Sequence, residues 1–175
     1  PDAPVPPPGS AGPIATVLNG NLVADSGGVL RAGSTGAAWY PTGSRYVYVS
    51  GGSLFSSQPG GGSVTCLSSG PGDSQPAVSF DGAVVAFLRN GGIFLTASDG
   101  SQAGREYQVP LNQTYGSVSY TGVGFPSFAP DGALLFTADG PAGYGVYRRW
   151  NGAVSLFLAG VSQLKYSPAG DRVTY

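Results

Sequence analysis

The stretch Phe128-Ala129-Pro130-Asp131-Gly132-Ala133-Leu134-Leu135-Phe136 combines an aromatic entry, a turn with glycine and an apolar run. The same plan recurs in three other places, at residues 39–49, 78–87 and 166–175. The turn glycines of the four copies lie 39, 50 and 38 residues apart; they are Gly43, Gly82, Gly132 and Gly170. Such a spacing is typical of proteins that repeat one supersecondary unit. The sequence therefore predicts a β-unit repeated four times.

Each unit is expected to hold four strands. In the second copy, apolar runs at residues 84–88 and 93–97 and a last run at 106–109 follow the entry strand, and Asn90-Gly91 and Asp99-Gly100 separate them. Those steps supply the positive φ angles of tight hairpins, so consecutive strands should pair antiparallel. No run has helical spacing, which predicts an all-β protein. Meanders of this kind cannot cover their own faces, and radial stacking into a β-propeller solves that problem.

The expected organisation is a Pro-rich extended tether at residues 1–12 and a propeller domain at 13–175. The predicted blades are residues 36–76, 77–123, 124–160, and 161–175 completed by 13–35. A last blade shared between both chain ends would remove exposed strand edges, which favours a closed ring of four blades. The alternative is a fragment of a larger propeller whose other blades lie beyond Tyr175.

Composition and charge exclude several classes of function. Eight basic residues against nine acidic ones give a net charge of −1, and no basic face is visible to neutralise a nucleic acid. The chain has no histidine and one cysteine, so the commonest general base and metal ligand is missing. No apolar run is long enough to span a membrane. We expect no catalytic residue, no cofactor and no metal site, and therefore no enzymatic activity.

Three of the turns carry a further resemblance. Ala129-Pro130-Asp131-Gly132, Ser79-Phe80-Asp81-Gly82 and Ser167-Pro168-Ala169-Gly170, with residues 40–43 as a weaker match, resemble the turn of the TolB-type, WD-like β-propeller repeat over roughly residues 12–175. The resemblance implies extracytoplasmic bacterial scaffolds that bind proteins, or the propeller halves of some serine peptidases. TolB itself has six blades and a preceding α/β domain, which do not fit into 175 residues, and the peptidase triad needs a histidine.

The acidic residues before glycines are expected to cap their own turns; they are Asp81, Asp99, Asp131 and Asp139. The alternative for them is a share in a Ca²⁺ site, which needs several converging oxygens. We expect the Cys66 thiol to be buried and inert in a short apolar strand.

Two groups are candidate contact residues for a protein or ligand. The first is the segment 111–125, which is the longest departure from the repeat and contains Tyr115 and Tyr120, together with the neighbouring Tyr107. A solvated hairpin extension is the alternative reading of that segment. The second group is rich in the residue types enriched at interfaces: Tyr144, Arg148, Arg149 and Trp150. Strand alternation should turn about half of the second group inward.

The expected function is that of a non-enzymatic, exported β-propeller, a protein-binding or structural subunit of a bacterial cell-envelope assembly. The Pro-rich start suggests export, with a lipid anchor on a cysteine before Pro1 or an ordinary linker as the two alternatives. The expected localisation is extracytoplasmic: periplasm, outer membrane or cell surface. The rival functions are a lectin-like propeller that binds a carbohydrate or small ligand, and an accessory propeller of a larger enzyme.

Overall fold

The computed structural model describes residues 15–19, 21–24, 29–59, 62–111, 119–167 and 170–175. All the secondary-structure elements within these ranges are β-strands, as the sequence predicted. No helix in this part of the chain has the length and apolar character needed to cross a membrane.

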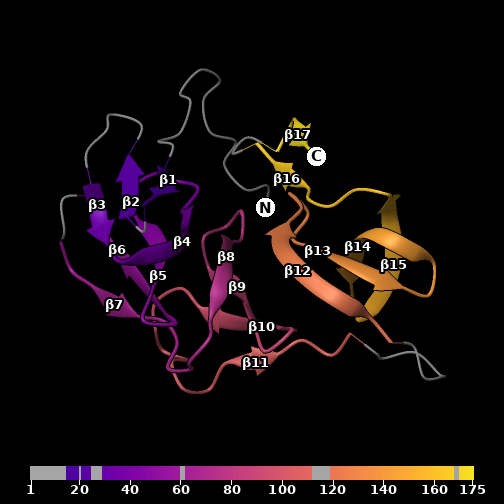
Figure 1. Cartoon of the computed structure of the whole chain (residues 1–175), viewed down its shortest axis with the longest axis horizontal. Helices are drawn as coiled ribbons and strands as arrows, with labels where there is room; N and C mark the ends of the chain where they lie inside the picture. Colours follow the sequence, from indigo (N-terminus) through magenta and orange to yellow (C-terminus); the bar gives the residue numbers. More distant parts are fainter. Residues whose placement is uncertain (1–14, 20, 25–28, 60–61, 112–118, 168–169) are drawn as a thin grey trace.

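Three of the repeat units form four-stranded antiparallel meanders, with strands in chain order (Figure 1). The first sheet consists of β4 (Ser34–Trp39), β5 (Tyr46–Ser50), β6 (Ser53–Ser57) and β7 (Thr65–Cys66). The second consists of β8 (Ser74–Val78), β9 (Val84–Arg89), β10 (Gly92–Ala97) and β11 (Tyr107–Gln108). The third consists of β12 (Thr121–Phe128), β13 (Leu134–Gly140), β14 (Gly143–Trp150) and β15 (Ala153–Ala159).

Asn-Gly steps close two of the hairpins, one in the second sheet and one in the third. Asn90 and Gly91 have φ angles of 50° and 75°, and Asn151 and Gly152 have 49° and 83°. Two successive positive φ angles match the twist of antiparallel strands, and asparagine and glycine tolerate them best. The sequence therefore fixes the position of both hairpins locally.

The acidic residues expected at turns do not all lie in turns. Ala83 N–H donates to Asp81 Oδ1 at 3.0 Å, and Ala133 N–H donates to Asp131 Oδ1 at 3.1 Å. Asp99 likewise accepts from Ser101 N–H at 2.9 Å. Asp139 is different, because it lies inside β13, opposite Thr121 and Tyr144. The prediction was wrong there, since β13 continues through Gly140 and the chain turns only afterwards.

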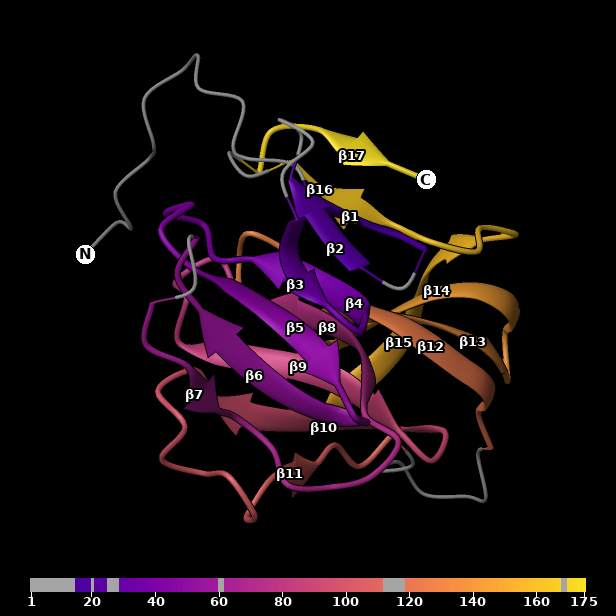
Figure 2. The same cartoon turned by 60° about the vertical axis from the view of Figure 1, so that its left-hand side comes forward.

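The sheets stack face to face in chain order (Figure 2), and the core lies between them. Val47, Val49 and Leu54 of the first sheet pack with Val85 and Phe87 of the second. The other face of the second sheet packs on the third; the buried side chains there include Ala86, Ile93, Phe136 and Tyr147. Burial of apolar side chains between sheets that cannot cover their own faces is the main stabilising term of this arrangement.

The two ends of the chain form separate sheets in the described ranges. β1 (Ala15–Leu18), β2 (Asn21–Ala24) and β3 (Val29–Ala32) make a three-stranded sheet, and β16 (Lys165–Tyr166) pairs only with β17 (Val173–Thr174). Leu22 of β2 is fully buried against Tyr46 and Tyr48, whereas the β16–β17 hairpin packs on the third sheet through Tyr166 and the preceding Leu164.

The predicted last blade, residues 161–175 completed by 13–35, is therefore not formed as one sheet. Each end packs on the four-stranded sheet nearest to it in the chain. The two end sheets hold three and two strands, which together exceed the four of a blade. Closure of the ring is not confirmed.

Candidate contact site

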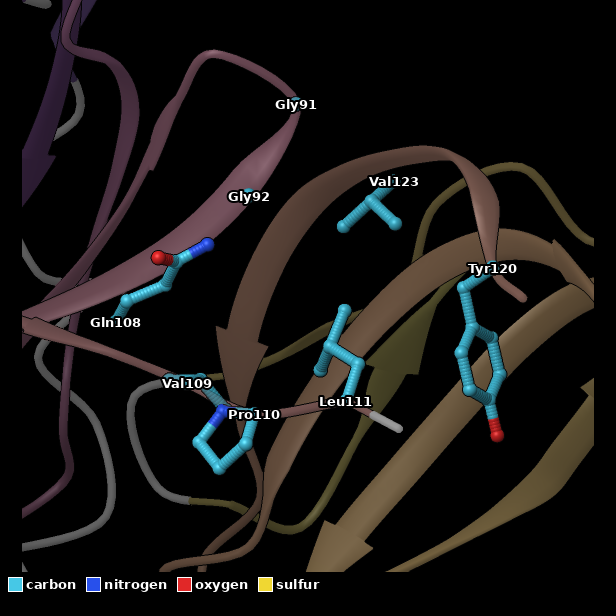
Figure 3. A pocket seen from close by; sticks show the side chains of 8 residues that line it. All are labelled: Gly91, Gly92, Gln108, Val109, Pro110, Leu111, Tyr120 and Val123. Carbon is cyan, nitrogen blue, oxygen red and sulfur yellow. The ribbon is translucent and has the colours of Figure 1, made fainter. Parts of the chain in front are cut away.

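A hollow of about 430 Å³ opens between the second and third sheets (Figure 3). This volume lies in the range of small-ligand sites, roughly 300–1,000 Å³. The lining residues come from the β9–β10 turn, from β11 and the chain after it, and from β12 and the residue before it: Gly91, Gly92, Gln108, Val109, Pro110, Leu111, Tyr120 and Val123.

Backbone hydrogen bonds place these residues around the hollow. Val109 N–H donates to Ile93 O at 2.8 Å, so the chain after β11 stays beside β10 and carries Pro110 and Leu111 past it. Figure 3 shows Leu111 and Val123 pointing toward each other across the hollow. The Gln108 amide lies on the side of Gly92, and the Tyr120 hydroxyl points away.

Tyr120 is anchored in the core of the third sheet. Its ring meets Tyr147 edge-on at 5.1 Å between centroids and Phe136 at 5.9 Å. Burial raises the pKa of the Tyr120 hydroxyl, and neighbouring Tyr147 adds to the increase. The side chain is therefore uncharged at neutral pH, and it contributes mainly an aromatic wall to the hollow.

Among the described residues, the lining carries no charged side chain, and the Gln108 amide is its main polar group. An uncharged ligand is therefore favoured, because a charged one would lose hydration without gaining a counter-charge. The lining residues that the structure describes do not pair a nucleophile with a base. Among the residues that the structure describes, no cluster of three or more histidines, cysteines or carboxylates could hold a metal ion.

The first group of predicted contact residues is only partly brought together. Tyr120 lines the hollow, whereas Tyr107 does not line it and is 52% exposed on β11. Tyr115 lies outside the described residues. Gln108, the group that offers a hydrogen bond there, was not predicted. The sequence carries no local signal for it, because only the approach of β12 makes it part of a site.

The second group splits between the two faces and the two ends of β14. The guanidinium of Arg148 forms an ion pair with Asp131 and lies 5.6 Å from the centre of the Trp150 ring. Burial opposes ionisation of Asp131, but Ala133 N–H and Arg148 outweigh it and lower the pKa of the carboxyl. Arg149 points to the other face, where it lies across from Leu134 and Val154, and its buried Nε has no hydrogen-bond partner among the described residues. Exposed Tyr144 lies at the far end of the strand.

The Cys66 side chain is exposed, so the expectation of a buried thiol was wrong. It belongs to β7, a strand of two residues at the outer edge of the first sheet, and among the described strands β7 pairs only with β6. Its Sγ lies 3.1 Å from Ser68 O and donates a weak hydrogen bond to it.

No known protein family matches the chain, and no curated protein matches it in sequence. Solved structures do resemble it. TolB from Acinetobacter baumannii matches with a TM-score of 0.62 and 20% identity over 87% of this chain and 41% of that one. Dihydro-heme d1 dehydrogenase NirN matches with a TM-score of 0.61 and 15% identity, over 98% of this chain and 41% of that one. Regucalcin from Agrobacterium tumefaciens matches with a TM-score of 0.56 and 12% identity, over 90% of this chain and 61% of that one.

At these identities the likeness concerns the fold alone, and it supports a β-propeller-type arrangement with TolB-like members among its neighbours. The chain spans about two fifths of the length of the first two structures.

Proposed function

We propose that the protein is a non-enzymatic, exported β-propeller that binds a protein partner as a subunit of a bacterial cell-envelope assembly. The observation that carries the proposal is the exposure of large aromatic side chains on two strands, β11 and β14, of a chain with few charges. Tyr107, Tyr144 and Trp150 are 52%, 48% and 42% exposed. Aromatic residues are enriched at protein interfaces, because they bury much area at little entropic cost.

Trp150 is the best-prepared anchor among these side chains. Arg148 lies against its ring and is itself held by Asp131, so the aromatic surface and the guanidinium keep a fixed relation. A partner that covers Trp150 gains apolar burial without ordering a loose side chain. The TolB-like fold and the Pro-rich start of the chain support an extracytoplasmic place for this contact.

Photo-crosslinking in the native bacterium tests the partner. A photoreactive phenylalanine analogue at Trp150 should link the protein to one fixed envelope protein other than a second copy of this chain, and the same analogue at exposed Thr42 should not. The purified pair should then bind at least tenfold more weakly with Trp150→Ala. Recovery of the untagged protein in the cytoplasmic fraction, or equal crosslinks at both positions, would overturn the proposal.

Binding of a neutral ligand such as a saccharide in the hollow is a second candidate function, favoured by its volume and uncharged lining. A glycan array should then give a signal that Gln108→Ala abolishes and that Gln102→Ala, at an exposed position outside the lining, preserves. Tyr120→Ala is unsuitable as the test, because it removes core contacts with Phe136 and Tyr147. A signal that ignores Gln108 would exclude this site.

A further inference from the structure

The outermost strand of the third sheet differs from its counterparts. β15 has seven residues, whereas β7 and β11, which occupy the same place in the other two sheets, have two each. Within the described ranges β15 pairs only with β14 (Figure 1). Its other edge therefore presents unpaired backbone donors and acceptors along about 20 Å, at roughly 3.3 Å per residue.

This edge has no charge to protect it. Residues 150–164 contain no Lys, Arg, Asp or Glu, and β15 contains no proline. Folded proteins usually guard an edge strand with charges, proline or short length, because a free edge pairs with other chains. A bulge opposite Val146 and Tyr147 is the one irregularity of the strand, and it lies at Phe157.

The pattern of the strand suits pairing with itself. Antiparallel partners must present the same face, and the register with Ser155 opposite Ser155 meets this condition, because it places Val154 opposite Leu156. Val154 and Leu156 both pack toward the core shared with the second sheet. Small residues thus meet at the centre, and apolar residues meet on the inner face.

The same register brings exposed aromatic side chains together. Trp150 pairs with Ala153 across the β14–β15 hairpin, so the two share a face. Antiparallel pairing about Ser155 sets Ala153 opposite Phe157 of the other copy, which puts that ring in the row of Trp150. Phe157 is 45% and Trp150 42% exposed. Each Arg148 is already paired with Asp131, so no uncompensated like charges are brought together.

We propose that two copies of this chain associate through antiparallel pairing of β15, with the two Ser155 residues facing each other across a twofold axis. Twofold dimers are the commonest soluble assemblies. The contact is small, a single pair of strands, so the dimer is a weak one.

Crosslinking tests the register. In a Cys66→Ser background, Ser155→Cys should form an intermolecular disulfide under mild oxidation, because directly opposite residues have Cβ atoms about 4.5–5.5 Å apart. Ser101→Cys, at an exposed position of the second sheet's loop, is the matched control and should stay monomeric. Equal crosslinking of both variants would overturn the register.

Sedimentation equilibrium tests the interface itself. The mass should rise from 17.6 kDa toward twice that value with concentration. Phe157→Lys, a change at an exposed position, should weaken association at least tenfold. Leu18→Lys, in the exposed part of β1, should not. A monomer at all concentrations, or a dimer lost with Leu18→Lys and kept with Phe157→Lys, would overturn the proposal.

Discussion

The repeat turn is held by a few polar atoms that recur from copy to copy. In the second copy Ser79 Oγ donates to Asp81 Oδ1 at 2.6 Å, and Gly82 N–H closes the turn on Ser79 O at 2.9 Å. In the last copy the acid stands one residue beyond the glycine, yet Ser167 Oγ still donates to Asp171 Oδ1 at 2.7 Å. The serine–carboxylate bond therefore survives a change of position, which explains why the turn tolerates variation.

At this scale Ser79→Ala should raise the pKa of Asp81. The Ser79 hydroxyl is the main cause that lowers this pKa, followed by the Ala83 N–H. A lowered carboxyl pKa stabilises the fold above the unfolded value of about 3.9, and that contribution disappears as pH falls through the folded pKa. The variant should thus lose less stability on acidification than the wild type.

An NMR titration of the Asp81 carboxyl checks the shift, with Ser63→Ala as the control, because Ser63 is exposed. An unchanged Asp81 titration in Ser79→Ala would contradict the assignment.

Among the elements, an ion pair ties the segment between the first and second sheets to the second sheet. Arg89 of β9 binds Asp73 through two bonds, Nε–Oδ1 at 2.5 Å and Nη2–Oδ2 at 2.9 Å. It also reaches Glu106 at 3.4 Å, and it lies about 5 Å from the ring centres of Phe87 and Phe94. The segment between β7 and β8, which ends at Asp73, is thereby tied to the second sheet.

Arg89→Met should destabilise the protein by about 3 kcal/mol, because it leaves the buried Asp73 carboxylate without its counter-ion. Urea denaturation measures the change. Arg105→Met is the control, because Arg105 is exposed and forms no ion pair within the described residues, and it should cost less than about 0.5 kcal/mol. Equal losses would show that the ion pair with Arg89 does not stabilise the segment that ends at Asp73.

Gly70→Ala tests the ion pair between Arg89 and Asp73 without changing either residue. A Cβ at Gly70 would overlap Arg89 Cζ, so the guanidinium would have to leave Asp73. We expect a loss of about 1–3 kcal/mol. In a double-mutant cycle the loss should shrink when Arg89 is already Met. Additive losses would contradict the predicted clash.

The whole molecule is a series of sheets, each covering the next. The three-stranded sheet of β1–β3 packs on the first sheet, and the β16–β17 hairpin packs on the third. The hairpin has only two strands, so it covers less of its neighbour than a four-stranded sheet does. The exposed Trp150 and Phe157 lie on the outer strands of the third sheet.

Leu22→Ala tests the stacking of the first of these sheets. Leu22 is fully buried against Tyr46 and Tyr48, so the cavity should cost about 3 kcal/mol of unfolding free energy. Leu18→Ala, in the same sheet but 57% exposed, should cost less than about 1 kcal/mol. Thermal unfolding of both variants provides the comparison. A harmless Leu22→Ala would mean that β1–β3 does not stack on the first sheet.

The sequence by itself determined the all-β class, the four-stranded meanders and the Asn-Gly hairpins. These depend on φ preferences and on apolar alternation within about ten residues. The prediction of a turn at Asp139 was wrong, because an Asp-Gly pair also fits inside a strand when the neighbouring strand continues to pair with it.

Only the tertiary structure decided where the chain ends pack, which side chains line the hollow, and how Arg89 meets Asp73. It also separated Arg148 from Arg149, and left β15 with a free edge. These features depend on how segments far apart in the chain pack against one another, and no short stretch of sequence encodes that.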